Sequence, residues 1–281
     1  MRKISQIFDI ALHTELKGES RVNFVFFFLF TCGLHFTFSR SHTLGVFIKR
    51  ISSYFPNEPF IIKNKVGSFE VAYFNDTIFT SSEYYEQSLE KWLGRSQHKQ
   101  IFLDLGANIG RYTILALKKY HFEKALSVEA NPYTFGILST NIKLNSIEKK
   151  AILCPTAIGN AAGTVKFQVD RHHLGGGSVV SEYIDNPIPY VQVEVPMITV
   201  DQVLVQQVVI PSHVDFVKID VESFTYQVLQ GMESLLKSMQ IGSCIMIEVG
   251  KDDAEVVAVL KQNNFYIVEQ DVRDTLFQKR K

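Results

Sequence analysis

From Gln100 onward the chain alternates short apolar runs with amphipathic stretches, and this alternation restricts the possible folds more than any other feature. Short apolar runs are typical of buried strands, and amphipathic stretches between them are typical of helices that cover a parallel sheet. The pattern predicts an α/β fold with a doubly wound, mostly parallel sheet. The expected strands are 101–105, 125–129, 151–155, 214–219, 244–249 and 265–269, with an added antiparallel pair at 164–169 and 190–199. The expected helices are 112–120, 134–144, 224–236 and 253–262.

Two further segments precede this domain, which we place at 98–281. Residues 58–97 contain two β-rich runs, 59–66 and 69–74, that are broken at Gly67. Helical spacing follows over 81–93, so we expect a hairpin and then a helix. Residues 1–57 form an N-terminal extension to the predicted domain.

The extension carries a phenylalanine-rich run within residues 22–39. A membrane-spanning helix needs about 20 mainly apolar residues, whereas polar side chains interrupt this run. A buried segment, docking at a membrane interface and a span therefore all stay open. Because Arg40, Lys49 and Arg50 lie nearby, residues 22–50 are a candidate for peripheral contact with anionic lipid.

Charge and cysteine content restrict the partners and the location. Lys and Arg together number 29, as do Asp and Glu, so the chain has no net field that would attract nucleic acid. We therefore expect no nucleic-acid partner. The three cysteines are widely spaced and odd in number, which fits neither a disulfide framework nor a zinc site. We expect a cytoplasmic protein without a metal site.

A turn rich in glycine follows the first core strand and leads directly into a helix. It contains Asp104, Gly106, Asn108 and Gly110. Glycine allows a sharp turn and close approach of a ligand, and the free N–H groups at a helix start favour a negative group. The dinucleotide fingerprint needs a glycine where Asn108 stands, so a dinucleotide is disfavoured. A packing turn without a ligand is the alternative.

Glu129 ends the second strand, nineteen residues after Gly110, and Asn131 follows it. A carboxylate at this place can accept hydrogen bonds from both hydroxyls of a ribose, although an acid near a helix start can also serve the helix alone. After the third strand, Ala157 and Ile158 could line a slot for adenine. The turn and the acid together predict a nucleoside ligand.

Charged residues gather where the strand 214–219 ends. Because side chains alternate along a strand, Lys218 and Asp220 share a face. A nearby cation favours the ionised carboxylate and lowers its basicity, which suits the orientation of a substrate hydroxyl. Glu222 follows and could face the same pocket or cap the next helix. The alternative for all three is a structural ion-pair network.

A glycine run at 175–177, preceded by His172 and His173, has the composition of a loop. Such a loop could close over a substrate, or it could simply connect two strands. The two histidines rank after Asp220 and Glu222 as candidate bases.

Four motifs make the chain resemble the FkbM family of S-adenosylmethionine-dependent methyltransferases: FLDLGANIGRYT at 102–113, VEANP at 128–132, AIGN at 157–160 and FVKIDVE at 216–222. The resemblance runs from about residue 98 to 250. It implies a class I methyltransferase fold, which is Rossmann-like, and methylation of a hydroxyl oxygen, often on a sugar or polyketide-like product. It also implies that Glu129 holds the ribose of S-adenosylmethionine and that Asp220 and Glu222 form an acidic pair near the site. The residues that would surround the methionine part are Asp104, Gly106, Asn108 and Gly110.

The chain departs from the family pattern directly after the acidic pair. The family usually continues with Gly-Ala-Glu, whereas this chain has Ser223, Phe224 and Thr225. The expected function is O-methylation of a hydroxyl on a glycan, glycolipid or secondary metabolite. The departure leaves open a catalytically impaired protein that binds S-adenosylmethionine. An NAD-dependent oxidoreductase is a third hypothesis, against which Asn108 argues.

Overall fold

The structure is a computed structural model and describes residues 14–15, 60–71, 80–83, 85–170, 173–178, 191–221, 224–248, 254–272 and 274–281. The chain divides into two units, Met1–Tyr85 and Glu86–Lys281. This division falls inside the predicted segment 58–97, and the domain limits drawn from the sequence stay predictions. Residues 22–50, the proposed membrane contact, lie outside the described residues. Within the described part, no helix combines the length and the apolar character needed to cross a bilayer.

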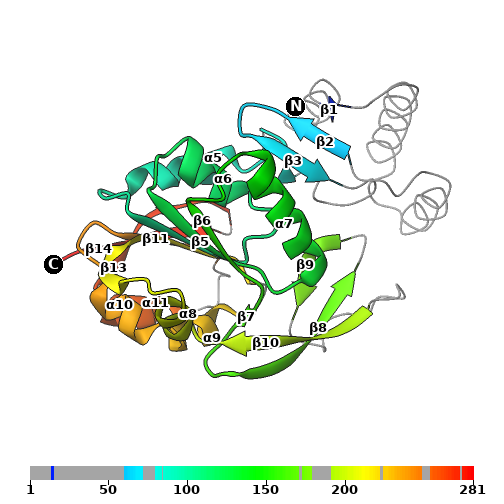
Figure 1. The fold of residues 1–281 in the computed structure, drawn as a ribbon. Helices are drawn as coiled ribbons and strands as arrows, with labels where there is room; N and C mark the ends of the chain where they lie inside the picture. The colour runs from blue at the N-terminus through cyan, green and yellow to red at the C-terminus, as the bar shows by residue number, and fades with distance from the viewer. Residues whose placement is uncertain are drawn as a thin grey trace. The chain divides into compact units, whose positions relative to one another are not determined.

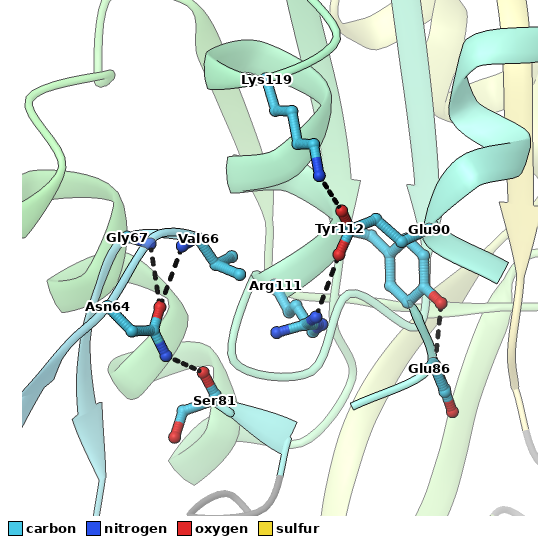
Figure 2. A network of polar contacts seen from close by, with 9 residues as sticks. All are labelled: Asn64, Val66, Gly67, Ser81, Glu86, Glu90, Arg111, Tyr112 and Lys119. Carbon is cyan, nitrogen blue, oxygen red and sulfur yellow. Dashed lines mark hydrogen bonds and ion pairs between the residues drawn. The ribbon is translucent and has the colours of Figure 1, made fainter. Parts of the chain in front are cut away.

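In the first unit, β1 (Thr14–Glu15), β2 (Phe60–Lys63) and β3 (Ser68–Val71) form an antiparallel sheet. The hairpin expected from the sequence is present as β2 and β3. Asn64 organises its turn, because its side-chain oxygen accepts hydrogen bonds from the N–H groups of Val66 (3.0 Å) and Gly67 (3.3 Å) (Figure 2). Its amide nitrogen donates to the carbonyl oxygen of Ser81 at 2.8 Å. An asparagine side chain that replaces a backbone partner in this way is typical of a tight turn.

The helix expected over 81–93 is shorter than predicted. The structure has α5 (Gln87–Glu90) followed by the 3-10 helix η1 (Lys91–Arg95). Glu86 lies before α5 with φ of 45°, in the left-handed region, so an α-helix cannot run through it. The helical spacing does not reveal this break.

The second unit is built on a seven-stranded sheet, in which every neighbouring pair is parallel except those made by β14, which is antiparallel to β12 and β13. The predicted fold class is confirmed. The six strands expected from the sequence are present, and β14 was not foreseen. In spatial order the strands are β13 (Phe265–Gln270), β14 (Asp274–Lys279), β12 (Cys244–Glu248), β11 (Val214–Ile219), β4 (Ile101–Leu105), β5 (Lys124–Val128) and β6 (Ala151–Cys154).

Helices cover both faces of this sheet (Figure 1). On one side lie α6 (Arg111–Lys118) and α7 (Pro132–Leu144); on the other lie α8 (Val200–Gln206), α9 (Thr225–Gln230), α10 (Glu233–Ser238) and α11 (Ala254–Gln262). The single helix expected over 224–236 is therefore two helices, separated at Gly231. A Cβ at Gly231 would lie 2.1 Å from the carbonyl oxygen of Gly159, so this break allows two backbone segments to meet.

A second sheet has the order β7 (Ala157–Ile158), β10 (Val191–Ile198), β8 (Gly163–Asp170) and β9 (His173–Ser178). The expected antiparallel pair is confirmed as β8 and β10. The prediction of a loop at the glycine run is wrong, because His173–Ser178 is a strand that pairs with β8. Backbone pairing needs no side chain, so glycine composition alone did not reveal this strand.

The order of the strands singles out one place in the large sheet, the carboxyl ends of β4 and β11. From β4 the chain runs outward to β5 and β6, then returns to β11 on the other side of β4. The strand order therefore reverses between β4 and β11. Ligands of doubly wound sheets bind at the carboxyl ends of the strands that flank such a reversal.

The C-terminus of α8 contains a valine in a strained conformation. Val208 has φ of 54° and is 90% exposed. Its N–H donates to the carbonyl oxygen of Val205 at 3.1 Å, and the N–H of Val209 donates to that of Leu204 at 2.8 Å. This is a Schellman motif, in which glycine usually takes the left-handed position.

We predict that Val208→Gly raises the free energy of unfolding by about 1 kcal/mol, because the left-handed conformation penalises a β-branched side chain. Urea denaturation of the full chain measures the change. The control is Val205→Gly inside the same helix, which should lower stability by up to about 1 kcal/mol. A loss of stability in Val208→Gly would contradict the prediction.

Candidate functional site

The turn after β4 takes a conformation that only its glycines allow easily. Gly106, Asn108 and Gly110 all have positive φ, at 77°, 49° and 86°. A Cβ at Gly106 would lie 1.9 Å from the carbonyl oxygen of Asp220, and one at Gly110 would lie 2.5 Å from a methyl carbon of Leu138. The two predicted glycines thus let the turn pass against the end of β11 and pack on α7.

Glu129 ties this turn to the start of α7. Its Oε2 atom accepts a hydrogen bond from the N–H of Asn108, and its Oε1 atom accepts one from the N–H of Asn131, both at 2.8 Å. Burial raises the pKa of Glu129 to about 7, although the two N–H groups and the charge of Lys218 lower it. A carboxylate oxygen can accept a second hydrogen bond, so Glu129 keeps the capacity to bind hydroxyl groups.

Buried polar atoms without a hydrogen-bond partner gather at the same edge of the sheet. Among the described residues they include the side-chain oxygens of Asn108 and Thr134, the side-chain nitrogen of Asn131 and the Oδ1 atom of Asp104. Asn131 caps α7, and Thr134 lies in the first turn of that helix. Because buried polar atoms are nearly always paired in proteins, this group indicates a place for a polar ligand.

Asp104 is fully buried at the carboxyl end of β4. Its Oδ2 atom accepts a hydrogen bond from the hydroxyl of Thr113 at 2.6 Å, and that hydroxyl lies 2.7 Å from the hydroxyl of Ser127. Burial raises the pKa of Asp104, while Lys218 and Thr113 lower it. Thr113 and Ser127 were not foreseen. Ser127 stands opposite Asp104 in the register of β4 and β5, so strand alignment could have found it.

Lys218 links the turn to the end of β11, and its contact with Asp220 confirms that the two side chains share a face. The ammonium lies 2.9 Å from the Oδ2 atom of Asp220, 3.4 Å from the carbonyl oxygen of Gly106 and 4.0 Å from the Oδ1 atom of Asp104. Burial lowers the pKa of Lys218, but Asp220 and Asp104 more than compensate and leave it raised. The buried lysine is therefore charged, whereas the side chain of Asp220 is 44% exposed.

The other predicted residues are only partly placed. Glu222, Ser223 and His172 lie outside the described residues. Ala157 and Ile158 form β7 and are buried, the first in an apolar cluster of the small sheet and the second in the main core. Their contact with adenine stays a prediction.

Asp274, which sequence reasoning missed, begins β14 opposite Glu248. Burial raises the pKa of Asp274 to about 7, and the charges of Glu86, Glu248 and Asp220 raise it further, whereas Lys218 lowers it. Carboxylates thus surround Lys218 at this edge.

Among the residues that the structure describes, no three His, Cys, Asp or Glu side chains converge as metal ligands do.

We predict that Gly106→Ala lowers the free energy of unfolding by about 3 kcal/mol, because positive φ and a clash with backbone act together. The control is Gly136→Ala in α7, where a Cβ meets nothing within 4 Å. That change should raise stability by about 0.5–1 kcal/mol. Urea denaturation compares the two, and similar effects from both would contradict the role given to Gly106.

Residues 104–267, more than half of the chain, match the methyltransferase FkbM domain. No curated protein sequence matches significantly.

The chain is also similar to solved structures, at low identity. M. jannaschii TYW2 in complex with AdoMet has 13% identity and a TM-score of 0.43, with 81% of this chain and 89% of that chain covered. M. jannaschii tRNA m1G37 methyltransferase has 14% identity and a TM-score of 0.41, and this chain spans only 57% of its length while 79% of this chain is covered. Precorrin-6y C5,15-methyltransferase from Geobacter metallireducens GS-15 has 12% identity and a TM-score of 0.40, with 69% of this chain and 87% of that chain covered. Likeness at this level says nothing about a substrate.

The match over 104–267 includes the turn after β4, Glu129 and the Lys218–Asp220 pair. The chain therefore belongs to the FkbM methyltransferase family and carries a methyltransferase domain whose methyl donor is S-adenosylmethionine.

Proposed function

We propose that the chain methylates a hydroxyl oxygen of a glycan, glycolipid or secondary metabolite. The observation that carries the proposal is the pairing of two features at one edge of the sheet. Glu129 and the unpartnered atoms around it suit a nucleoside. Next to them, the half-exposed carboxylate of Asp220, held by Lys218, suits a hydroxyl group.

The residues present fit S-adenosylmethionine. The turn from Gly106 to Gly110 would take the methionine part, where Asn108 has an unpartnered amide oxygen for its amino group. Glu129 would accept the ribose hydroxyls, and Asn131 offers an unpartnered N–H nearby. Ala157 and Ile158 would line the adenine. The cofactor supplies a methyl group that is already activated by its attachment to a positively charged sulfur.

The protein's own task is to bind and orient the acceptor, because proximity and exclusion of water account for much of such a reaction. Asp220 accepts a hydrogen bond from the acceptor hydroxyl and takes up its proton as the new bond forms. Lys218, at 2.9 Å from its Oδ2 atom, fixes the direction of the Asp220 side chain. Glu222 would assist as the second acid of the pair.

Other acceptors and functions are less well supported. Among the solved structures above is a tRNA methyltransferase, but the equal numbers of basic and acidic residues and the carboxylates around Lys218 disfavour a polyanion here. Ser223, Phe224 and Thr225 keep the hypothesis of a protein that binds the cofactor without turnover. NAD is disfavoured because Asn108 occupies the place of the middle glycine.

We predict that the purified chain transfers tritium from methyl-labelled S-adenosylmethionine to a carbohydrate, lipid or metabolite fraction of an extract of its source cells. Asp220→Asn should lower this transfer by about 100-fold, because general-base assistance contributes about 10²–10⁴-fold, while S-adenosylhomocysteine binding persists. Glu123→Gln, an exposed acid before β5, is the control. Binding of S-adenosylhomocysteine with no transfer to any fraction would support the impaired protein instead.

A second prediction concerns the pH dependence of cofactor binding. Ribose hydroxyls donate to the ionised form of Glu129, so binding favours loss of its proton. With a pKa of about 7 in the free protein, affinity for S-adenosylhomocysteine should rise about tenfold from pH 6 to pH 8. Calorimetry in two buffers of different ionisation enthalpy should detect proton release. Glu129→Gln should weaken binding and abolish the dependence; an unchanged pH profile in this variant would refute the role of Glu129.

A further inference from the structure

Tyr112 lies under the charged group that joins the two halves of the site. It follows the turn by two residues, in the first turn of α6, and its side chain is buried. The ammonium of Lys218 lies 5.1 Å from the centre of its ring. A cation at this distance over an aromatic face is attracted by the negative face of the ring's quadrupole, and the attraction is stronger where water is excluded.

The ring is itself fixed from the other side. The hydroxyl of Tyr112 donates a hydrogen bond to the Oε2 atom of Glu86 at 2.8 Å (Figure 2). Burial, and then the negative charge of Glu86, raise the pKa of Tyr112 well above its ordinary value, so the phenol stays protonated. Donation to a carboxylate leaves the ring richer in electrons, which favours a cation on its face.

A neighbouring ion pair holds the same turn of α6. Arg111, directly before Tyr112, is buried and lies 3.2 Å from a carboxylate oxygen of Glu90, and Lys119 contacts the other oxygen (Figure 2). Glu86 and Glu90 are four residues apart, about one helical turn. Two acids from one short segment thus hold two consecutive residues of α6.

The remaining sides of the Lys218 ammonium are occupied by Asp220, the carbonyl oxygen of Gly106 and Asp104. The ring closes the ammonium off without offering a competing oxygen. If the ring were removed, water could take its place, and the ammonium could turn away from Asp220.

We propose that Tyr112, held by Glu86, is a positioning residue that fixes the Lys218 ammonium between the cofactor turn and Asp220. The inference rests on the proposed function, in which Lys218 and Asp220 act on the acceptor. Neither Tyr112 nor Glu86 needs to touch the substrate. They act through Lys218.

The test measures the reactivity of Lys218 in the full chain. Acetic anhydride at pH 8 acetylates accessible amines, and peptide mass spectrometry gives the rate at Lys218 relative to other lysines. Tyr112→Leu removes the ring and should raise this rate about tenfold, whereas Tyr112→Phe keeps the ring and should raise it only about twofold. An unchanged rate in a folded Tyr112→Leu protein would overturn the proposal.

A matched control comes from the other end of α6, where Lys119 lies 5.7 Å from the ring centre of Tyr120. Tyr120→Leu removes an equivalent ring and should leave the rate at Lys218 unchanged. If Tyr112→Leu does not fold, Glu86→Ala decides: a rise of about threefold at Lys218 supports the proposal, and no change overturns it.

Methyl transfer separates this inference from the proposed function. In Tyr112→Leu, transfer should fall about tenfold at saturating cofactor while affinity for S-adenosylhomocysteine changes less than about twofold. If wild-type protein transfers no methyl group, the proposed function fails, whereas the reactivity of Lys218 still decides the positioning. If Tyr112→Leu exposes Lys218 but transfers methyl groups as fast as wild type, the positioning role is overturned.

Discussion

The backbone contact between the turn after β4 and the end of β11 is the constraint on which the site depends. The N–H of Asp220 donates to the carbonyl oxygen of Leu105 at 3.0 Å, and Gly106 passes so close to Asp220 that a Cβ would find no room. This contact exists because the strand order reverses between β4 and β11. It brings together the turn and the strand end to which we assign cofactor binding and catalysis.

The charged groups at this end of the sheet are stabilised by one another rather than by solvent. Lys218 is buried, yet its carboxylate neighbours keep it charged. Asp104 and Glu129 show the opposite effect, since burial raises the pKa of both. A buried charge is costly when it is unpaired, so removal of any one member affects the others. The site therefore acts as one electrostatic unit that spans β4, β5 and β11.

The sequence was sufficient wherever the signal was local. The strands 101–105 and 214–219 were predicted with their observed bounds, and the glycine turn and the face shared by Lys218 and Asp220 followed from spacing alone. The helix α8 was missed although a local signal exists, the capping box of Thr199 and Gln202. Tyr112, Glu86 and Asp274 could not be found, because their roles come from contacts between segments far apart in the chain.

The position of β14 has a consequence for assembly. Among the strands that the structure describes, β13 is the outermost of the large sheet and pairs with β14, which lies between it and β12. β13 can therefore join the sheet only together with β14 or after it. Before β14 docks, the backbone N–H and C=O groups along one side of β12 are open to other chains, and Asp274 is absent from the acidic surroundings of Lys218. Docking of β14 thus covers one side of β12 and completes the acidic surroundings of Lys218 in the same event.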